Sequence, residues 1–92
     1  MKPKLLDLFC GAGGAAMGYH RAGFDPYGID NKLQPHYPFP FLLMDALEAV
    51  DRLLRGEGLT FNNGETLYLA DFLAFHASPP CQEYSIIQGF TS

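Results

Sequence analysis

A glycine-rich stretch near the start of the chain, residues 9–14 (FCGAGG), constrains the fold more than any other feature. It follows the apolar run 4–9, which is typical of a short buried strand although Asp7 interrupts it. It also opens the segment 13–23, whose small residues and terminal glycine predict a helix. Glycines at such a turn permit tight backbone conformations and the close approach of a ligand. The sequence therefore predicts a strand–loop–helix unit that can bind a nucleotide.

The rest of the chain continues this alternation of strands and helices. The expected elements are a strand at 24–30, a loop or broken helix at 31–40, a strand at 41–44, a helix at 45–56, a hairpin at 57–70 and a strand at 71–78. Asp45 is a good N-cap for the second helix, and Gly56 ends it. The apolar face of that helix is expected to comprise Ala46, Leu47, Val50, Leu53 and Leu54. This order predicts an α/β fold with an open, mostly parallel sheet.

The composition argues against several classes of protein. With 92 residues, 48% of them apolar, the chain can form one small domain. Six basic residues are scattered among ten acidic ones, which is not the pattern of a self-contained nucleic-acid-binding module. No signal peptide and no apolar run of about 18 residues is found, so a cytoplasmic protein is expected. The histidines lack partners at metal-ligand spacing, so no metal is expected, and His76 is expected to be a hydrogen-bonded core residue.

An aspartate strengthens the nucleotide-binding interpretation of the glycine loop. Gly11 to Ala16 fit the loose pattern G-x-G-x-x-[G/A], and Asp30 follows Gly11 by nineteen residues at the end of the next expected strand. A carboxylate there can accept hydrogen bonds from two ribose hydroxyls. The pattern does not distinguish NAD from S-adenosylmethionine, and a glycine turn that serves packing alone is the alternative. Asp45 can accept a hydrogen bond from an adenine amino group, serve as a helix N-cap, or do both.

Cys81 lies in the stretch 78–85 (SPPCQEYS), directly after the last expected strand. A lone cysteine is more often a buried small hydrophobe than a nucleophile. Its place behind two prolines at a strand end favours the nucleophile here, whereas a disulfide with Cys10 is not expected in a reducing compartment. Because ligands of open α/β sheets bind at the carboxyl ends of strands, Phe9, Asp30, Asp45 and Cys81 are expected to form one composite site.

Four stretches together resemble DNA (cytosine-5) methyltransferases. Residues 7–24 resemble the first motif of that family, and 78–85 resemble its catalytic Pro-Cys-Gln motif. Residues 28–31 (GIDN) and 44–48 (MDALE) stand where the ribose and adenine motifs of the family are found, with Asp30 replacing the more usual glutamate. The resemblance implies a partial Rossmann-like fold of the S-adenosylmethionine-dependent methyltransferases.

The resemblance also implies a role for each matching residue. Cys81 would be the catalytic nucleophile that adds to a cytosine flipped out of DNA, while Phe9 would stack on the adenine of S-adenosylmethionine and Asp30 would bind its ribose. The cofactor-binding residues implied in this way are Phe9, Cys10, Gly11, Gly13, Gly14, Asp30, Asn31, Asp45, Ala46 and Pro80. Cys10 would contribute its backbone, and its thiol would be a packing group.

The resemblance covers only the cofactor half of the family's catalytic domain. Residues 1–56 would be the cofactor-binding part, 57–70 a hairpin insertion, and 71–92 the catalytic strand with the start of a mobile loop. The DNA-recognition parts have no counterpart here, which leaves a fragment, a remnant or a subunit completed by a second polypeptide. Two rival functions remain: a non-catalytic cofactor-binding half-domain that needs a partner chain, and a dinucleotide-binding domain of an oxidoreductase, against which the PPCQ motif argues.

Overall fold

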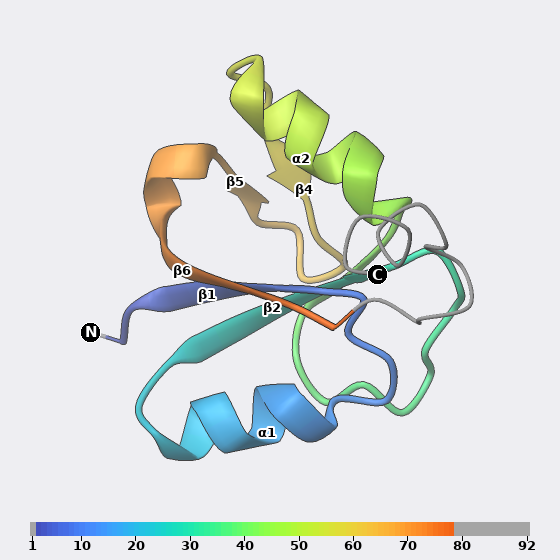
Figure 1. The fold of residues 1–92 in the computed structure, drawn as a ribbon, viewed down its shortest axis with the longest axis vertical. Helices are drawn as coiled ribbons and strands as arrows, with labels where there is room; N and C mark the ends of the chain where they lie inside the picture. Colours follow the sequence, from blue (N-terminus) through green and yellow to red (C-terminus); the bar gives the residue numbers. More distant parts are fainter. Residues whose placement is uncertain (1, 79–92) are drawn as a thin grey trace, which may run out of the picture.

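The computed structural model describes residues 2–78, and its centre is a four-stranded parallel sheet (Figure 1). Pro80 and Cys81 lie outside the described residues. The strands of the sheet, in the spatial order β3-β2-β1-β6, are β3 (Phe41–Leu43), β2 (Asp25–Asp30), β1 (Lys4–Leu8) and β6 (Phe72–Ala77). The α/β class and the open parallel sheet expected from the sequence are confirmed.

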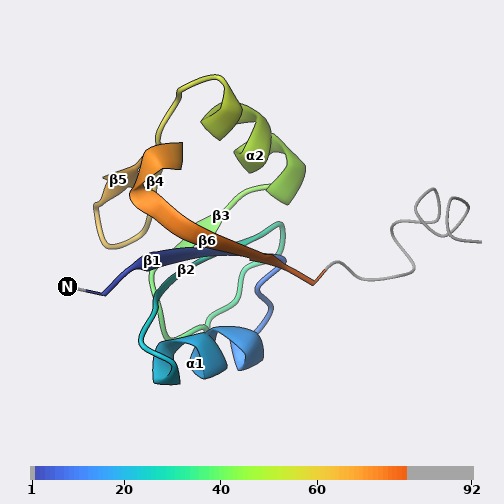
Figure 2. The ribbon, with the colours of Figure 1, turned by 60° about the vertical axis from the view of Figure 1, so that its left-hand side comes forward.

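Two helices cover opposite faces of the sheet (Figure 2). They are α1 (Gly14–Arg21) and α2 (Ala46–Leu54). On the α2 face, Leu6 and Leu8 of β1 join the larger core cluster with Ala49 and Leu53. On the α1 face, a smaller cluster comprises Cys10, Ala16, Tyr37 and Phe41. The central strands are thus buried on both sides, with residues 5–8 of β1 and 26–29 of β2 all buried.

Helix α2 begins and ends where the capping residues predict. The side chain of Asp45 accepts a hydrogen bond from the Glu48 amide at 3.1 Å, and Gly56 adopts a left-handed φ of 83° after the last turn. The predicted apolar face is wrong at Leu47 and Leu54, which are 63% and 70% exposed. The buried stripe of α2 is narrower and comprises Ala46, Ala49 and Leu53, which recur at intervals of three and four residues.

Residues 57–71 form an antiparallel hairpin and a short turn that pack under α2. Their elements are β4 (Leu59–Thr60), β5 (Thr66–Leu67) and the 3-10 helix η1 (Leu69–Asp71). Leu59 and Leu67 belong to the larger core cluster, and the Tyr27 hydroxyl donates a hydrogen bond to Glu65 at 2.6 Å. The hairpin therefore helps to build the main core and is not a surface appendage.

Candidate functional site

The glycine loop between β1 and α1 has a tightly wound backbone. Phe9, Gly11 and Gly13 adopt left-handed φ values of 58°, 55° and 100°. Glycine accepts this region without strain, whereas for Phe9 it carries a cost that proteins tolerate mainly at functional sites. The Gly13 amide closes the turn on the Cys10 carbonyl at 3.2 Å, and the Cys10 amide donates to Ile29 at 3.1 Å. The loop is therefore fastened to the end of β2.

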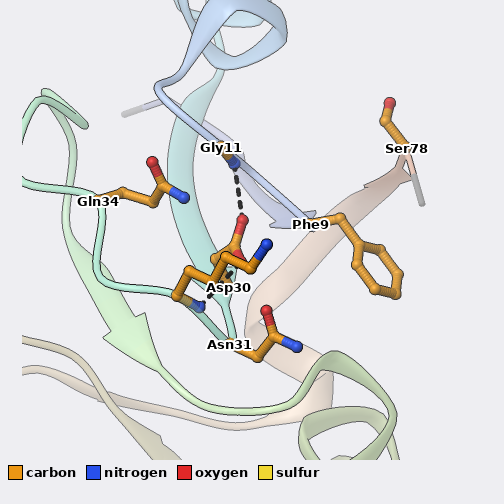
Figure 3. A pocket seen from close by; sticks show the side chains of 7 residues that line it. Phe9, Gly11, Asp30, Asn31, Gln34 and Ser78 are labelled. Atoms are coloured by element: carbon orange, nitrogen blue, oxygen red, sulfur yellow. Dashed lines mark hydrogen bonds between the residues drawn. The ribbon is translucent and has the colours of Figure 1, made fainter. Parts of the chain in front are cut away.

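Asp30, the last residue of β2, holds the loop from the other side (Figure 3). One carboxylate oxygen accepts a hydrogen bond from the Gly11 amide at 3.0 Å, and the other accepts one from the Lys32 amide at 3.1 Å. The Asp30 carbonyl also accepts a hydrogen bond from Met44 at 3.0 Å. Because an ionised carboxylate offers about four acceptor positions, Asp30 keeps capacity for further donors.

A pocket of about 220 Å³ opens at the carboxyl ends of β1, β2 and β6. The pocket is lined by Phe9, Gly11, Asp30, Asn31, Lys32, Gln34 and Ser78. It lies where the strand order reverses between β1 and β6, which is the usual ligand position in open α/β sheets. Figure 3 shows Phe9 and Ser78 on one side of it and Asp30, Asn31 and Gln34 on the other.

The structure brings together four of the residues predicted from the sequence, namely Phe9, Gly11, Asp30 and Asn31. Among the described residues, the other predicted contacts do not line this pocket; these are Cys10, Gly13, Gly14, Asp45 and Ala46. Asp45 has the N-cap role described above, and Ala46 is buried in the core. Contact of Asp45 with an adenine amino group stays a prediction.

The Cys10 thiol is a packing group, as its position in the loop predicts. Its side chain is buried with Ala16, Tyr37 and Phe41, and burial, followed by the charges of Asp7 and Asp30, raises its pKa to about 12. A thiol with such a pKa stays protonated at neutral pH and is a poor nucleophile. Cys10 is therefore unsuited to covalent catalysis.

The sequence interpretation gave no role to Asp7 or Tyr37, which lie beneath the glycine loop. Asp7 is 1% exposed, and burial raises the pKa of its carboxyl group from 3.8 to about 6. The Tyr37 hydroxyl donates a long hydrogen bond of 3.5 Å to this carboxylate, and burial raises the pKa of Tyr37 as well. An acidic residue within an otherwise apolar strand was the one signal that pointed to this pair.

Tyr37 and Pro38 also explain two glycines. A Cβ atom added at Gly28 would lie 2.7 Å from the Tyr37 hydroxyl oxygen, and one added at Gly13 would lie 2.9 Å from Pro38. The proline-rich segment 31–40 thus inserts an aromatic ring between β2 and the glycine loop. Gly28 is required by this contact with protein, independently of any ligand.

His76 of β6 is hydrogen-bonded on both ring nitrogens, as expected, but is half-buried and not a core residue. Its partners are Tyr19 of α1 and Ser78 at the pocket. In the part of the chain that the structure describes, residues 2–78, no cluster of His, Cys, Asp and Glu could hold a metal ion. Within the same residues, no helix is long and apolar enough to cross a membrane.

Comparison with known proteins identifies the family. The model of the C-5 cytosine-specific DNA methylases matches residues 3–90, which is nearly the whole chain. The chain belongs to this DNA methylase family. Its fold is accordingly that of a Rossmann-like methyltransferase, with the pocket at the carboxyl ends of the strands. No solved structure matches this methylase chain.

A curated relative supports the same assignment. The methylase chain is 32% identical over 89 residues to the Type II methyltransferase M.AgeI of Thalassovita gelatinovora. The alignment covers 89% of this chain and 19% of the relative, so the chain spans about a fifth of the length of the curated protein that it matches.

Proposed function

We propose that this chain is the S-adenosylmethionine-binding and Cys81-bearing part of an enzyme that methylates carbon 5 of cytosine in DNA. One observation carries the proposal: the Asp30 carboxylate is fixed against the glycine loop, at the edge of a pocket whose opposite side bears Phe9. A nucleoside needs such a pair, because a carboxylate binds ribose hydroxyls and an aromatic ring stacks on the base.

The charges around the pocket favour a cationic ligand over a dinucleotide. Asp30 and one cation, Lys32, line the pocket, and Asp7 lies beneath the glycine loop, where its charge interacts with that of Asp30. Two carboxylates against one ammonium leave an excess of negative charge, which favours the positively charged sulfonium of S-adenosylmethionine over a pyrophosphate. This supports the methyl donor over NAD, which the glycine pattern alone does not distinguish.

Cys81 supplies the covalent step of the proposed reaction. Its thiolate adds to carbon 6 of the flipped cytosine, which breaks the aromaticity of the ring and makes carbon 5 nucleophilic. When bound, S-adenosylmethionine would supply an electrophilic methyl group for that carbon, with S-adenosylhomocysteine as the leaving group. Transfer of the carbon 5 proton to a base or to water, with expulsion of the Cys81 thiolate, then restores the ring.

Further polypeptide is needed for the complete enzyme. Six basic residues among ten acidic ones give a net charge of −4, which is unfavourable for binding DNA, and the relative M.AgeI is several times longer than the matched segment. Among the described strands, β6 pairs with β1 alone. Leu54 and Phe75, 70% and 48% exposed, border an apolar groove beside it. These features support completion by more of the same chain or by a second polypeptide, with DNA as the shared substrate.

Titration calorimetry with S-adenosylmethionine and, separately, NAD tests the cofactor. We expect the chain to bind S-adenosylmethionine, and Asp30→Ala to weaken that binding by roughly tenfold or more, because charge-assisted hydrogen bonds are lost. Asp25→Ala, at the opposite end of the same strand, is the matched control and should retain affinity. Binding of NAD in place of the methyl donor would favour the oxidoreductase, and unchanged affinity in Asp30→Ala would refute the ribose role.

DNA that contains 5-fluorocytosine separates an enzyme from a non-catalytic half-domain. Fluorine at carbon 5 prevents the final elimination, so a competent enzyme remains covalently attached to DNA. With the completing polypeptide and S-adenosylmethionine present, the adduct should form with the wild type and with Cys10→Ala but not with Cys81→Ser. Cofactor binding with no adduct from the wild type would favour the non-catalytic half-domain, and an adduct from Cys81→Ser would disprove the assigned nucleophile.

A further inference from the structure

A chain of hydrogen bonds connects α1 to the end of β6 beside the pocket. The Tyr19 hydroxyl lies 3.0 Å from Nδ1 of His76, and Nε2 of His76 lies 2.6 Å from the Ser78 hydroxyl. The Tyr19 and His76 rings also contact each other, with centroids 5.2 Å apart. Because both imidazole nitrogens form hydrogen bonds, the orientation of the His76 ring is fixed.

The chemistry of the two partners favours one tautomer. A phenol is a better donor than acceptor, so we assign the Tyr19 hydroxyl as the hydrogen-bond donor to Nδ1, which places the hydrogen of a neutral His76 ring on Nε2. In that tautomer Nε2 is the donor to the Ser78 oxygen, 2.6 Å away. Tyr19 is itself held by Phe24, whose ring meets it edge-on at 6.0 Å. In this assignment Tyr19 donates to His76, and His76 donates to Ser78.

Ser78 connects this chain of bonds with the site. It lines the same pocket as Phe9 and Asp30, and Figure 3 shows it beside Phe9, on the side away from Asp30. His76 and Ser78 are two residues apart at the end of a strand, so their side chains lie on the same face of the sheet. Fixing the Ser78 side chain on that face also fixes the backbone that borders the pocket.

We propose that His76 is a positioning residue for the cofactor pocket, acting through Ser78 and oriented by Tyr19. The identity of the ligand rests on the proposed function, but the hydrogen-bond chain does not. A merely structural tie between α1 and β6 is the competing explanation. It predicts lower stability in variants without a specific loss of ligand affinity.

A double-mutant cycle on S-adenosylmethionine affinity tests the proposal. We expect His76→Gln and Ser78→Ala each to weaken binding by about 3–10-fold, the range of one lost hydrogen bond. The double variant should bind S-adenosylmethionine no more weakly than the single variant with the larger loss, because both residues act through one contact. Tyr19→Phe, which keeps the ring, should have a smaller effect in the same direction, and His36→Gln in an exposed loop should have none. Lower melting temperature with unchanged affinity, or additive losses, would overturn the proposal.

The ¹⁵N resonances of the His76 ring provide a readout that needs no ligand. The wild type should show one fixed tautomer with hydrogen on Nε2, and Tyr19→Phe should release it into exchange between tautomers. If the wild type fails to bind S-adenosylmethionine, the proposed function fails while a fixed ring still supports the hydrogen-bond chain. A ring that averages like free imidazole in the wild type refutes the positioning role whatever the ligand result.

Discussion

The contact between Gly28 and Tyr37 leads to a quantitative prediction for Gly28→Ala. The new Cβ atom would lie 2.6 Å from Cε2 and 2.7 Å from the hydroxyl oxygen of Tyr37, well inside van der Waals contact. The ring has little room to move, because it is 8% exposed and packs against Phe39 and Phe41 at centroid distances of 5.7 and 6.0 Å. The substitution therefore overpacks the smaller core cluster.

Overpacking of this kind costs about 1–3 kcal/mol in the free energy of unfolding. For a domain of this size, that corresponds to a decrease in Tm of roughly 4–8 °C for each kcal/mol. Urea denaturation followed by circular dichroism measures the difference. Gly18→Ala in α1 is the matched control, since its new Cβ atom meets nothing within 4 Å and alanine stabilises a helix by roughly 0.5–1 kcal/mol.

A second substitution isolates the cause. Tyr37→Leu removes the ring and hydroxyl atoms that lie nearest to position 28, so Gly28→Ala should cost little in that background. The double variant should lose less free energy of unfolding than the sum of the losses in the two single variants. Equal costs of Gly28→Ala in both backgrounds, or no cost in the wild type, would show that the Tyr37 ring does not fill this space.

Three further predictions concern single residues. The Asp7 carboxyl has a pKa raised from 3.8 to about 6, so its contribution to stability is fully present below about pH 4, and about 3 kcal/mol of it is lost as the pH rises through 6. Urea titrations at several pH values should show this decline in the wild type and not in Asp7→Asn, and parallel curves would contradict it. Asp45→Ala should lower the free energy of unfolding by about 1 kcal/mol through loss of the α2 cap, whereas Asp51→Ala, in an exposed ion pair, should change it by less. In a Cys81→Ser variant, Cys10 should resist iodoacetamide at pH 8 until urea unfolds the chain, and rapid labelling of the native protein would disprove its burial.

The elements set by local signals were predictable from the sequence. The apolar run before the glycine loop identified β1, Asp45 and Gly56 bounded α2, and the spacing of Asp30 from Gly11 placed both at one pocket. Each of these depends on residues close in sequence or on a turn with strict backbone requirements.

The parts that the sequence did not predict depend on long-range packing. Tyr37 reaches Asp7 across thirty positions, and its contact with Gly28 follows from the path of the loop 31–40 and not from a periodic pattern. Helical periodicity likewise could not show that Leu54 stays exposed, because the width of the buried stripe depends on what covers α2.

The cost of burying Asp7 connects the stability of the fold with the proposed ligand. A carboxyl group whose pKa is raised to about 6 is mostly ionised at pH 7, so the protein keeps a buried negative charge at the expense of stability. The charge of His76 and the hydrogen bond from Tyr37 lower the pKa of Asp7 against the effect of burial, and repulsion from Asp30 raises it further. A sulfonium in the pocket would relieve both charges, whereas a pyrophosphate would increase the repulsion. On this argument, affinity for S-adenosylmethionine should rise as Asp7 ionises between pH 5 and 7, and Asp7→Asn should remove that rise. If Asp7→Asn keeps the wild-type dependence of affinity on pH, then Asp7 does not contribute to the electrostatic selection of the ligand, and only Asp30 does.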